Sequence, residues 1–143
     1  MKLRYYLNIG TNLGNREQNL QNAIAALSEG ADQVVVSTVV VSEPWGFVSP
    51  HPFLNVGVAL FSPLTPEEML HHIHRIERAL GSEAHRDAEG GYIDRLVDID
   101  IMAIEDEQGA PVEVHSPTLT VPHPHLHHRP FFLQPYHELK SRH

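Results

Sequence analysis

Two aspartates stand two positions apart in the segment Arg-Leu-Val-Asp-Ile-Asp-Ile-Met, which covers residues 95–102. If this segment is a strand, Asp98 and Asp100 point to the same face, because successive side chains of a strand alternate. Mg²⁺ prefers oxygen ligands and commonly lies between one or two carboxylates and substrate phosphates. The pair therefore fits a magnesium site that handles phosphate groups. It also fits the solvated face of an ordinary strand, and the spacing alone leaves both interpretations open.

An aromatic ring and an amide share one face of a second candidate strand. Phe53 and Asn55 are also two positions apart, while Leu54 and Val56 between and after them face the opposite side. A ring that stacks and an amide that forms hydrogen bonds together suit a flat heterocyclic ligand. A single phenylalanine is more often part of the core, so this pattern alone favours packing over binding.

Histidine is abundant, with 12 copies in the chain. Two groups are close in sequence, namely His71, His72 and His74, and then His123, His125, His127 and His128. A transition-metal site built from His125, His127 and His128 is one interpretation, but so short and proline-interrupted a segment seldom supplies a complete tetrahedral site. We therefore expect the second group to form a solvated loop. His74 and Glu77 lie one helical step apart and could either reach a ligand or form an exposed surface pair.

Composition restricts the classes of function. With 143 residues the chain has the size of one domain, and we expect a single domain over residues 1–143. A formal net charge of -8 with only 10 Lys and Arg argues against a nucleic-acid partner. No segment reads as a membrane span, and the first residues lack the apolar core of a signal peptide. The absence of cysteine excludes disulfides and thiolate metal sites, and we expect a cytoplasmic protein.

The elements that must position these residues follow from periodicity and capping residues. Strands are predicted over residues 3–9, 34–41, 53–61 and 95–102, and helices over residues 15–27 and 65–80. Asn15 and Thr65 are the predicted helix caps. The β-branched run at 34–41 predicts one strand that is buried on both faces. From Glu105 onward we expect loops, short strands and a single helical turn near residues 131–139.

The element order β-α-β-β-α-β predicts the fold. It is the signature of the ferredoxin-like arrangement, an α+β fold in which helices pack on one face of an antiparallel sheet. The other face of the sheet would remain available, and the residues after the core would form a C-terminal extension. Because this fold hosts many unrelated functions, a non-catalytic module that binds a small ligand fits the element order as well as an enzyme does.

Five short motifs stand in order along the chain. They are Asn8-Ile-Gly-Thr-Asn-Leu-Gly14, Ser42-Glu-Pro-Trp-Gly46, Phe53-Leu-Asn55, the segment 95–102, and Thr120-Val-Pro-His123 with Arg129 and Phe131. Together they resemble the motifs of the hydroxymethyldihydropterin pyrophosphokinase family, from about Leu7 to about Leu139. Several motifs in the right order are far more specific than any one of them. The resemblance implies pyrophosphoryl transfer from ATP to the hydroxymethyl group of 6-hydroxymethyl-7,8-dihydropterin, with release of AMP, in folate biosynthesis.

For the pterin, the resemblance implies a sandwich between two aromatic rings, those of Phe53 and Phe131. The amide of Asn55 and a preceding loop would read the edge of the pterin. The residues that the resemblance implies in pterin binding are Ser42, Pro44, Trp45, Phe53, Asn55 and Phe131.

For the nucleotide, the resemblance implies ATP as co-substrate and two Mg²⁺ ions held by Asp98 and Asp100. Arg95 and Arg129 would join the aspartates in catalysis. The other residues implied in ATP binding are His74, Glu77, Arg86, Tyr92, Ile101, Thr120 and His123. We expect ATP and the pterin alcohol as the only partners, with no nucleic acid, no membrane and a monomeric chain.

One loop, residues 82–94, departs from the family pattern. Family members often carry several Arg or Lys there and a Trp-Gly-Pro-Arg stretch, whereas this chain keeps Arg86 and, just after the loop, Arg95. Tyr92 stands in place of the tryptophan. The loop also carries acidic residues that would oppose a triphosphate unless they turn outward, namely Glu83, Asp87 and Glu89. We therefore predict weaker binding of ATP or a different grip on it.

Overall fold

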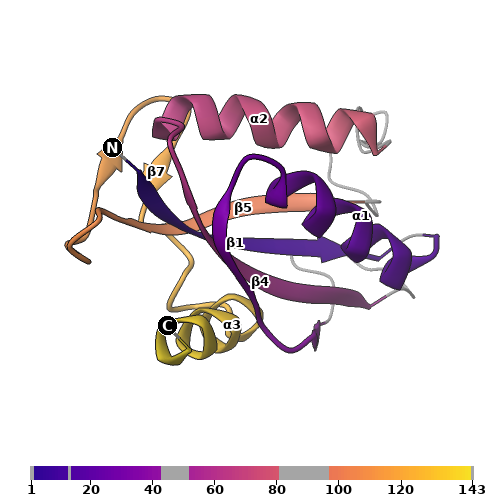
Figure 1. Ribbon diagram of the computed structural model, residues 1–143. Helices are drawn as coiled ribbons and strands as arrows, with labels where there is room; N and C mark the ends of the chain where they lie inside the picture. Colours follow the sequence, from indigo (N-terminus) through magenta and orange to yellow (C-terminus); the bar gives the residue numbers. More distant parts are fainter. Residues whose placement is uncertain (1, 13, 43–51, 81–96, 143) are drawn as a thin grey trace.

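The computed structural model describes residues 2–12, 14–42, 52–80 and 97–142 and shows a sheet between layers of helices (Figure 1). The strands are β1 (Leu3–Thr11), β2 (Asp32–Val36), β3 (Val40–Ser42), β4 (Phe53–Ser62), β5 (Asp98–Glu105), β6 (Val114–His115) and β7 (Thr120–Val121). The helices are α1 (Arg16–Ser28), α2 (Pro66–Ala79) and α3 (Pro130–Ser141). Helices α1 and α2 lie on one side of the sheet and α3 lies on the other.

The main sheet has the strand order β2-β4-β1-β5, with β3 as a second partner of β4, and each described pairing is antiparallel. This is the α+β arrangement that the element order predicts. The register of the central strands decides which side chains meet. Gly10 lies opposite Asn55 on β4 and opposite Asp98 on β5. Asn8 lies opposite Gly57 on β4, and its partner on β5 is Asp100.

The main core lies between the sheet and the helices α1 and α2. Alternate positions of the central strands, such as Leu7 and Val58, meet the inner stripes of the helices, such as Leu20 and Ile73. All four side chains are at most 3% exposed. Burial of such a side chain contributes about 1.5–3 kcal/mol relative to its exposure to water. The apolar residues that recur with strand and helix periods in the sequence are thus the residues that form this core.

The two N-terminal helix caps form as predicted. Asn15 accepts a hydrogen bond from the backbone N–H of Gln18 at 3.1 Å, at the start of α1. Helix α2 begins with a capping box, in which the N–H of Glu68 donates to Oγ1 of Thr65 at 3.2 Å. In return, the N–H of Thr65 donates to Oε1 of Glu68 at 2.9 Å. These bonds satisfy backbone donors that the start of a helix leaves without partners, and they fix the residue at which α2 begins.

The β-branched run at 34–41 is not one strand, and the prediction of a single buried strand is wrong. Strand β2 ends at Val36 and β3 begins at Val40. Nor is the run buried on both faces, because Val39 and Val41 are 52% and 65% exposed. Both strands lie beside β4 at the edge of the sheet. The tendency of valine to form strands does not reveal whether a neighbouring layer covers it.

The C-terminal segment forms a helix of 12 residues, α3, where the sequence predicts a single turn near residues 131–139. Its interior contains Pro135, and a proline inside a helix lacks a donor and usually breaks it. The helix continues because it packs closely on the sheet at Gly57 of β4. A Cβ added at Gly57 would lie only 2.8 Å from the Cβ of Pro135. Tertiary packing here outweighs local propensity.

Helices α1 and α2 pack on one face of the sheet, as predicted, and α3 from the C-terminal extension partly covers the second face. Phe132 and Leu139 of α3 pack against Tyr6 and Met102 of the sheet. All four side chains are at most 1% exposed. The part of this face that α3 leaves uncovered carries the pocket described below.

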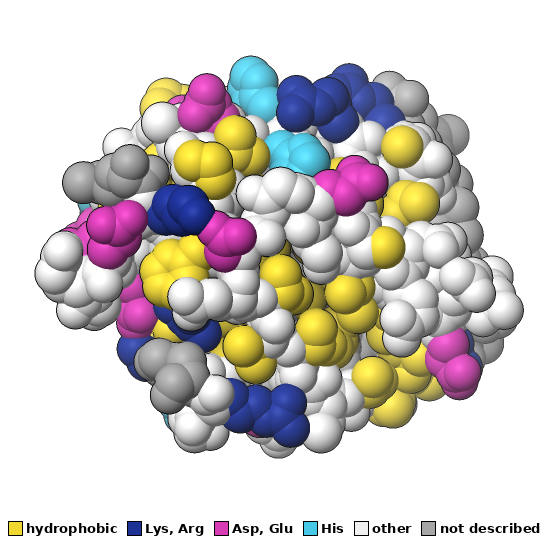
Figure 2. Space-filling model, viewed as in Figure 1, with side chains coloured by type: hydrophobic (Ala, Val, Ile, Leu, Met, Phe, Trp, Pro, Cys, Tyr) yellow, Lys and Arg dark blue, Asp and Glu magenta, His cyan; other side chains and the backbone are white. Residues whose placement is uncertain are grey.

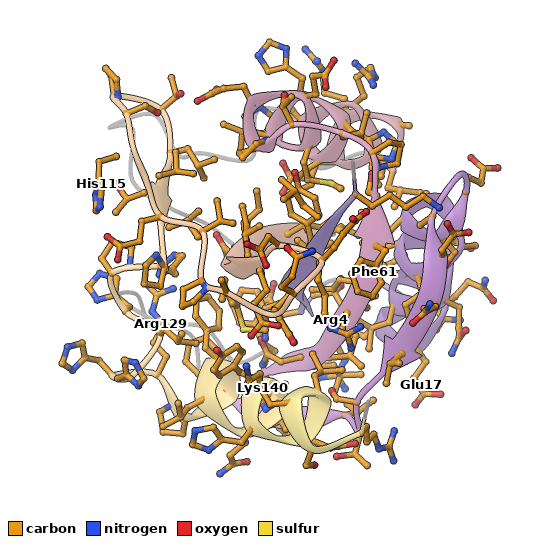
Figure 3. The ribbon with its side chains drawn as sticks, turned by 60° about the vertical axis from the view of Figure 1, so that its left-hand side comes forward. Arg4, Glu17, Phe61, His115, Arg129 and Lys140 are labelled. Atoms are coloured by element: carbon orange, nitrogen blue, oxygen red, sulfur yellow. The ribbon has the colours of Figure 1, made fainter. Side chains whose placement is uncertain are left out.

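A buried charged network fastens the C-terminal end of α3 to the sheet. Arg4 is 4% exposed and donates from Nε to the hydroxyl of Tyr6 at 3.0 Å, and that hydroxyl donates to Oε1 of Glu105 at 2.9 Å. Lys140 of α3 donates to the other oxygen of Glu105. Figure 3 shows Arg4 beside Phe61, whose ring centre lies 5.2 Å from the guanidinium carbon. The network gives the buried Glu105 a hydroxyl donor and an ammonium partner, and it anchors the helix far from the pocket.

Histidine and basic side chains gather over the outer face of α2, at the top of Figure 2. His71, His74 and Arg75 are exposed on this helix. Elsewhere on the face shown in Figure 2, acidic and basic side chains are interspersed. Among the helices of the described ranges, none combines the length and apolar character that a membrane crossing demands.

Candidate active site

A pocket of about 780 Å³ lies where strands β1, β4 and β5 meet α2, the β6–β7 hairpin and the start of α3. Every candidate site residue within the described ranges lines it: Ser42, Phe53, Asn55, His74, Glu77, Asp98, Asp100, Ile101, Thr120, His123, Arg129 and Phe131. The fold thus brings together side chains that are far apart in the sequence. The remaining candidates lie outside the described residues, so their roles stay predictions: Pro44, Trp45, Arg86, Tyr92 and Arg95.

Asp98 and Asp100 stand at the start of β5 and line the pocket together. Ile99 between them is 5% exposed and belongs to the core on the opposite face, so the predicted alternation is confirmed. The side chain of Asp100 is 31% exposed, which leaves its carboxylate accessible from the pocket. Strand β5 runs on to Glu105, beyond the predicted end at Met102.

The two carboxylates fit magnesium better than a transition metal. Over the described ranges, no group of three or more His, Asp or Glu side chains is arranged to hold an ion, and this includes His125, His127 and His128. Mg²⁺ often binds through one or two carboxylates, and substrate phosphates and waters complete its coordination shell. A pair of carboxylates that faces an open pocket is the donor set that this mode of binding needs.

The outer edge of β5 is held by α2. The backbone N–H of Ile99 donates to Oε2 of Glu77 at 2.8 Å. Ile99 lies between the two aspartates, and the other edge of β5 pairs with β1. Glu77 therefore helps to hold the backbone between Asp98 and Asp100, and with it both carboxylates, in place at the pocket. His74, one turn earlier on the same helix, is exposed at the rim.

Positive charge faces the two aspartates from the N-terminus of α3, where Figure 3 labels Arg129. Burial lowers the pKa of the Arg129 guanidinium, and the carboxylates of Asp100 and Asp98 act in the opposite direction. The guanidinium carbon lies 5.0 Å from the ring centre of Phe132 and 5.8 Å from that of Phe131. A guanidinium stays protonated in proteins, so a cation shares the pocket with the carboxylates of Asp98 and Asp100.

His123 adds a neutral hydrogen-bond donor to the same wall. Its Nδ1 accepts a hydrogen bond from the backbone N–H of His125 at 3.0 Å, so the proton of the neutral ring belongs on Nε2. That Nε2 lies 3.9 Å from Oδ1 of Asp100. The ring also meets the ring of Phe132 edge-on, with centres 4.9 Å apart. Burial, and then the charges of Arg129 and His125, lower the pKa of His123 to about 4.

The lowered pKa of His123 predicts a loss of stability on acidification. The folded ring stays neutral down to a pKa of about 4, whereas the ordinary value is 6.5. Its contribution to the free energy of unfolding is therefore present above pH 6.5 and is lost as the pH falls from 6.5 towards 4. Solvent reaches part of the ring and screens it, so we expect about 1–2 kcal/mol.

Two measurements check this expectation. An NMR titration of the His123 ring should show a midpoint well below the ordinary value, and a midpoint near 6.5 would show that the ring is not enclosed as described. In parallel, unfolding of a His123→Gln variant should depend less on pH across the same range than unfolding of the wild type.

The same pocket also carries aromatic and amide side chains. Phe53 and Phe131 border the pocket and are only half-buried, so neither is an ordinary core residue. Asn55 is 2% exposed, and its Nδ2 donates to Oγ of Ser42 at 2.7 Å, which fixes the orientation of the amide. Gly10 faces this amide, and a Cβ added there would lie 3.1 Å from Oδ1 of Asn55. Rings together with an oriented amide suit a flat ligand with a polar edge.

Residues 6–141 match the model of one protein family, described as 7,8-dihydro-6-hydroxymethylpterin-pyrophosphokinase (HPPK). The match spans every described residue of the pocket, from Asn8 to Phe132. The chain belongs to this family. The resemblance inferred from the sequence motifs is thereby confirmed.

Three relatives of this pyrophosphokinase chain carry the name 2-amino-4-hydroxy-6-hydroxymethyldihydropteridine pyrophosphokinase. The relative from Porphyromonas gingivalis is 41% identical over 131 residues, which cover 91% of this chain and 86% of the relative. The relative from Aquifex aeolicus is 34% identical, with 94% of this chain and 79% of the relative covered. The relative from Bacillus subtilis is 33% identical, and the shares covered are 94% and 76%.

Several pocket residues of this pyrophosphokinase chain are not among the candidates that the sequence supplies. They are Asn8, Gly10, Leu70, Ile99, Pro117, Thr118, Leu119, Pro124, His125 and Phe132. Period-two alternation along β1 is the signal that could have found Asn8 and Gly10, because it places both on one face. No such local signal marks Thr118. Its hydroxyl donates to Oε2 of Glu67 at 3.2 Å and ties the β6–β7 hairpin to the start of α2.

Proposed function

We propose that this chain transfers the pyrophosphoryl group of ATP to the hydroxymethyl oxygen of 6-hydroxymethyl-7,8-dihydropterin, a step of folate biosynthesis. Membership of the pyrophosphokinase family and the names of the relatives support this activity. The alcohol oxygen forms a bond to the β-phosphorus and loses its proton. The bond from that phosphorus to the α,β-bridging oxygen breaks, and AMP leaves with the electron pair.

One observation carries the proposal, namely that a single pocket joins two chemically different sets of side chains. The first set is a pair of carboxylates and a guanidinium, from Asp98, Asp100 and Arg129. The second set is two aromatic rings and an oriented amide, from Phe53, Phe131 and Asn55. The first set suits a metal-bound triphosphate and the second suits a pterin ring. The reaction needs both ligands side by side.

Asp98 and Asp100 are the proposed magnesium ligands, with two ions by resemblance to the family. When bound, magnesium would neutralise negative charge on the transferred group and on the oxygens whose bonds to phosphorus form and break. The support is chemical, because both aspartates line the pocket, and Mg²⁺ held by two carboxylates keeps coordination positions for phosphate oxygens and waters. Glu77 supports them from behind through the amide of Ile99.

The other polar groups of the chain would act by positioning and charge, since phosphoryl transfer needs little covalent help from a protein. The fork of the Arg129 guanidinium matches phosphate oxygens, to which it can donate two parallel hydrogen bonds. His123 offers Nε2–H from the same wall, and its lowered pKa keeps it neutral at pH 7. It would therefore orient the phosphates as a fixed donor rather than as a second cation.

The pterin would lie between Phe53 and Phe131, where offset stacking contributes about 0.5–1.5 kcal/mol beyond burial. The Nδ2 group of Asn55 already donates to Ser42 at 2.7 Å, so Oδ1 is the atom oriented to accept from the amino and ring N–H groups of the pterin. This arrangement favours a ligand whose edge carries donors. Pro44 and Trp45 remain proposed pterin contacts on the family pattern alone.

The adenosine part of ATP would lie towards α2 and the β6–β7 hairpin, where His74, Ile101 and Thr120 line the pocket. The proposed nucleotide contacts that rest on the sequence alone are Arg86 and Tyr92, and the proposed catalytic role of Arg95 rests on the sequence alone as well. We also propose that the chain is one catalytic domain, that it works as a monomer and that it acts in the cytoplasm.

One assay tests the proposed function. The protein with ATP, Mg²⁺ and the pterin alcohol should release AMP and pterin pyrophosphate in equal amounts. Omission of the pterin, or chelation of the metal, should stop the release. A non-catalytic binding module would bind pterin or nucleotide without AMP release, and formation of ADP in place of AMP would exclude pyrophosphoryl transfer.

Substitution of Gly10 should weaken pterin binding selectively. The methyl group of Gly10→Ala would lie 3.1 Å from Oδ1 of Asn55, so the amide must give way by a few tenths of an ångström, and it would touch Cδ1 of Phe53 at 3.4 Å. We expect the KM for the pterin to rise about tenfold, or about 1.4 kcal/mol, and the KM for ATP to change less than about twofold. Steady-state kinetics with each substrate varied in turn measures both. An equal rise for ATP would argue against a pterin beside Asn55 and Phe53.

A further inference from the structure

Pro135 interrupts the hydrogen bonding of α3 at one carbonyl group. In an α-helix the C=O of each residue accepts from the N–H four positions later. Four positions after Phe131 stands Pro135, which has no N–H. The carbonyl of Phe131 must therefore take a donor from outside the regular pattern of the helix, because buried backbone groups are nearly always paired.

Asn8 of β1 supplies that donor. Its Nδ2 lies 2.8 Å from the carbonyl oxygen of Phe131. Asn8 is 1% exposed, so water competes little for this hydrogen bond. On β5 its partner in the ladder is Asp100. The bond thus joins the strand beside the aspartates to the first turn of α3, which carries a ring of the pocket.

Pro135 itself packs on the sheet directly beside Asn8. Its Cβ lies over Gly57, where a Cβ added to the glycine would be 2.8 Å away, and Gly57 is the partner of Asn8 on β4. Positions 131 and 135 share one side of the helix. Pro135 therefore packs on Gly57, and the carbonyl of Phe131, which lacks a helical donor because of Pro135, bonds to the neighbouring Asn8. Both contacts hold the same part of α3 against the sheet.

We propose that Asn8 is a positioning residue for the pterin site and that it acts through Phe131. It fixes the first turn of α3 against β1, and with it the ring of Phe131 at the border of the pocket. This role rests on the proposed function, in which that ring stacks on the pterin. The aspartates and Arg129 have their own contacts, so the effect falls on the pterin more than on the nucleotide.

The kinetic test compares Asn8→Ala with the wild type. Loss of the amide donor should raise the KM for the pterin about tenfold, while kcat and the KM for ATP change less than about twofold. Asn22→Ala on the exposed side of α1 is the matched control, and its kinetic constants should equal those of the wild type. An equal rise in both KM values would show a general structural role and would overturn the proposal.

A second pair of variants tests whether Asn8 compensates for the proline. P135A introduces an N–H at the position where the helix lacks one, so the carbonyl of Phe131 gains a donor within α3. In that background Asn8→Ala should raise the KM for the pterin only about twofold. A tenfold rise in both backgrounds would mean that the two residues act independently, which the proposal excludes.

Chemical denaturation of the same four proteins separates this inference from the proposed function, because it needs no substrate. The shift in unfolding midpoint caused by Asn8→Ala should be smaller in the P135A background. Equal shifts overturn the inference even if the wild type is an active pyrophosphokinase. A wild type that binds no pterin overturns the proposed function and the positioning role with it. If Asn8→Ala does not fold, Asn8→Ser takes its place in the cycle.

Discussion

Replacement of Asp98 or Asp100 by alanine is expected to reduce AMP release by about three orders of magnitude or more. Each carboxylate would hold magnesium against the phosphates, and loss of several kcal/mol of charge stabilisation in the transition state corresponds to such a factor. The effect should appear mainly in kcat, because the charge to be stabilised develops as the pyrophosphoryl group moves. Discontinuous measurement of AMP at saturating ATP and pterin gives the rate of each variant.

The loss should not come from unfolding. Asp98 and Asp100 lie at the pocket and are not fully buried, so the unfolding midpoints of both variants should stay close to that of the wild type. Asp32→Asn is a suitable control, since it removes an exposed carboxylate at the start of β2, away from the pocket. It should leave AMP release unchanged. Near-normal activity of either pocket variant would remove both aspartates from the proposed mechanism.

Gly57→Ala is expected to destabilise the protein, although the same change in most strands would stabilise it. Glycine within a strand usually costs about 0.5–1 kcal/mol relative to alanine. Here the added Cβ would lie 2.8 Å from the Cβ of Pro135 and 2.9 Å from Cδ1 of Leu139, closer than unstrained atoms approach. Overpacking of this kind costs about 1–3 kcal/mol, so the net sign reverses. Urea denaturation should show a lower midpoint.

A double variant identifies the clash as the cause. Leu139→Ala removes one of the two atoms that would lie within 3.0 Å of the added Cβ, so the two changes together should cost less than the sum of their separate effects. Additive costs, or a stabilised Gly57→Ala variant, would show that α3 does not pack on β4 as described. Because Pro135 lies in the same helix turn as Phe131, a shift of Pro135 away from the added methyl group would also move Phe131. Gly57→Ala alone should therefore also weaken pterin binding.

The sheet and the helices α1 and α2 could be predicted because their signals are local. Asn15 and Thr65 make their capping bonds to residues only three positions away. The alternation around Ile99 likewise decides within a few residues which side chains face the core. Elements of this kind are determined by neighbours in the sequence, and their order then limits the topology to very few arrangements.

The length of α3 and the division of the run at 34–41 could not be predicted from the sequence. Pro135 argues against a helix locally, and only the distant contacts with Gly57 and Asn8 make the helix continue. In the run at 34–41, the β-branched residues indicate strands but not that Val41 stands at the exposed edge of a sheet. Both errors depend on residues that are distant in the sequence. Contacts with them extend α3, whereas no layer within the described ranges covers Val41.

The site shows the same division. The grouping of Asp98, Asp100 and Asn55 at one pocket could be predicted, because strand alternation and the order of the motifs single them out. The support of the site could not be predicted, because Asn8 acts on a carbonyl 123 positions away and Gly10 acts by the space that it leaves. Such residues reveal their roles only when the strands are in register.

A crystal structure with Mg²⁺ and a non-hydrolysable ATP analogue tests the central claim most directly. The account predicts oxygens of both Asp98 and Asp100 at about 2.0–2.1 Å from magnesium, with phosphate oxygens and waters in the remaining positions. If either carboxylate instead points away from the metal and the phosphates lie elsewhere, the proposed catalytic centre is wrong.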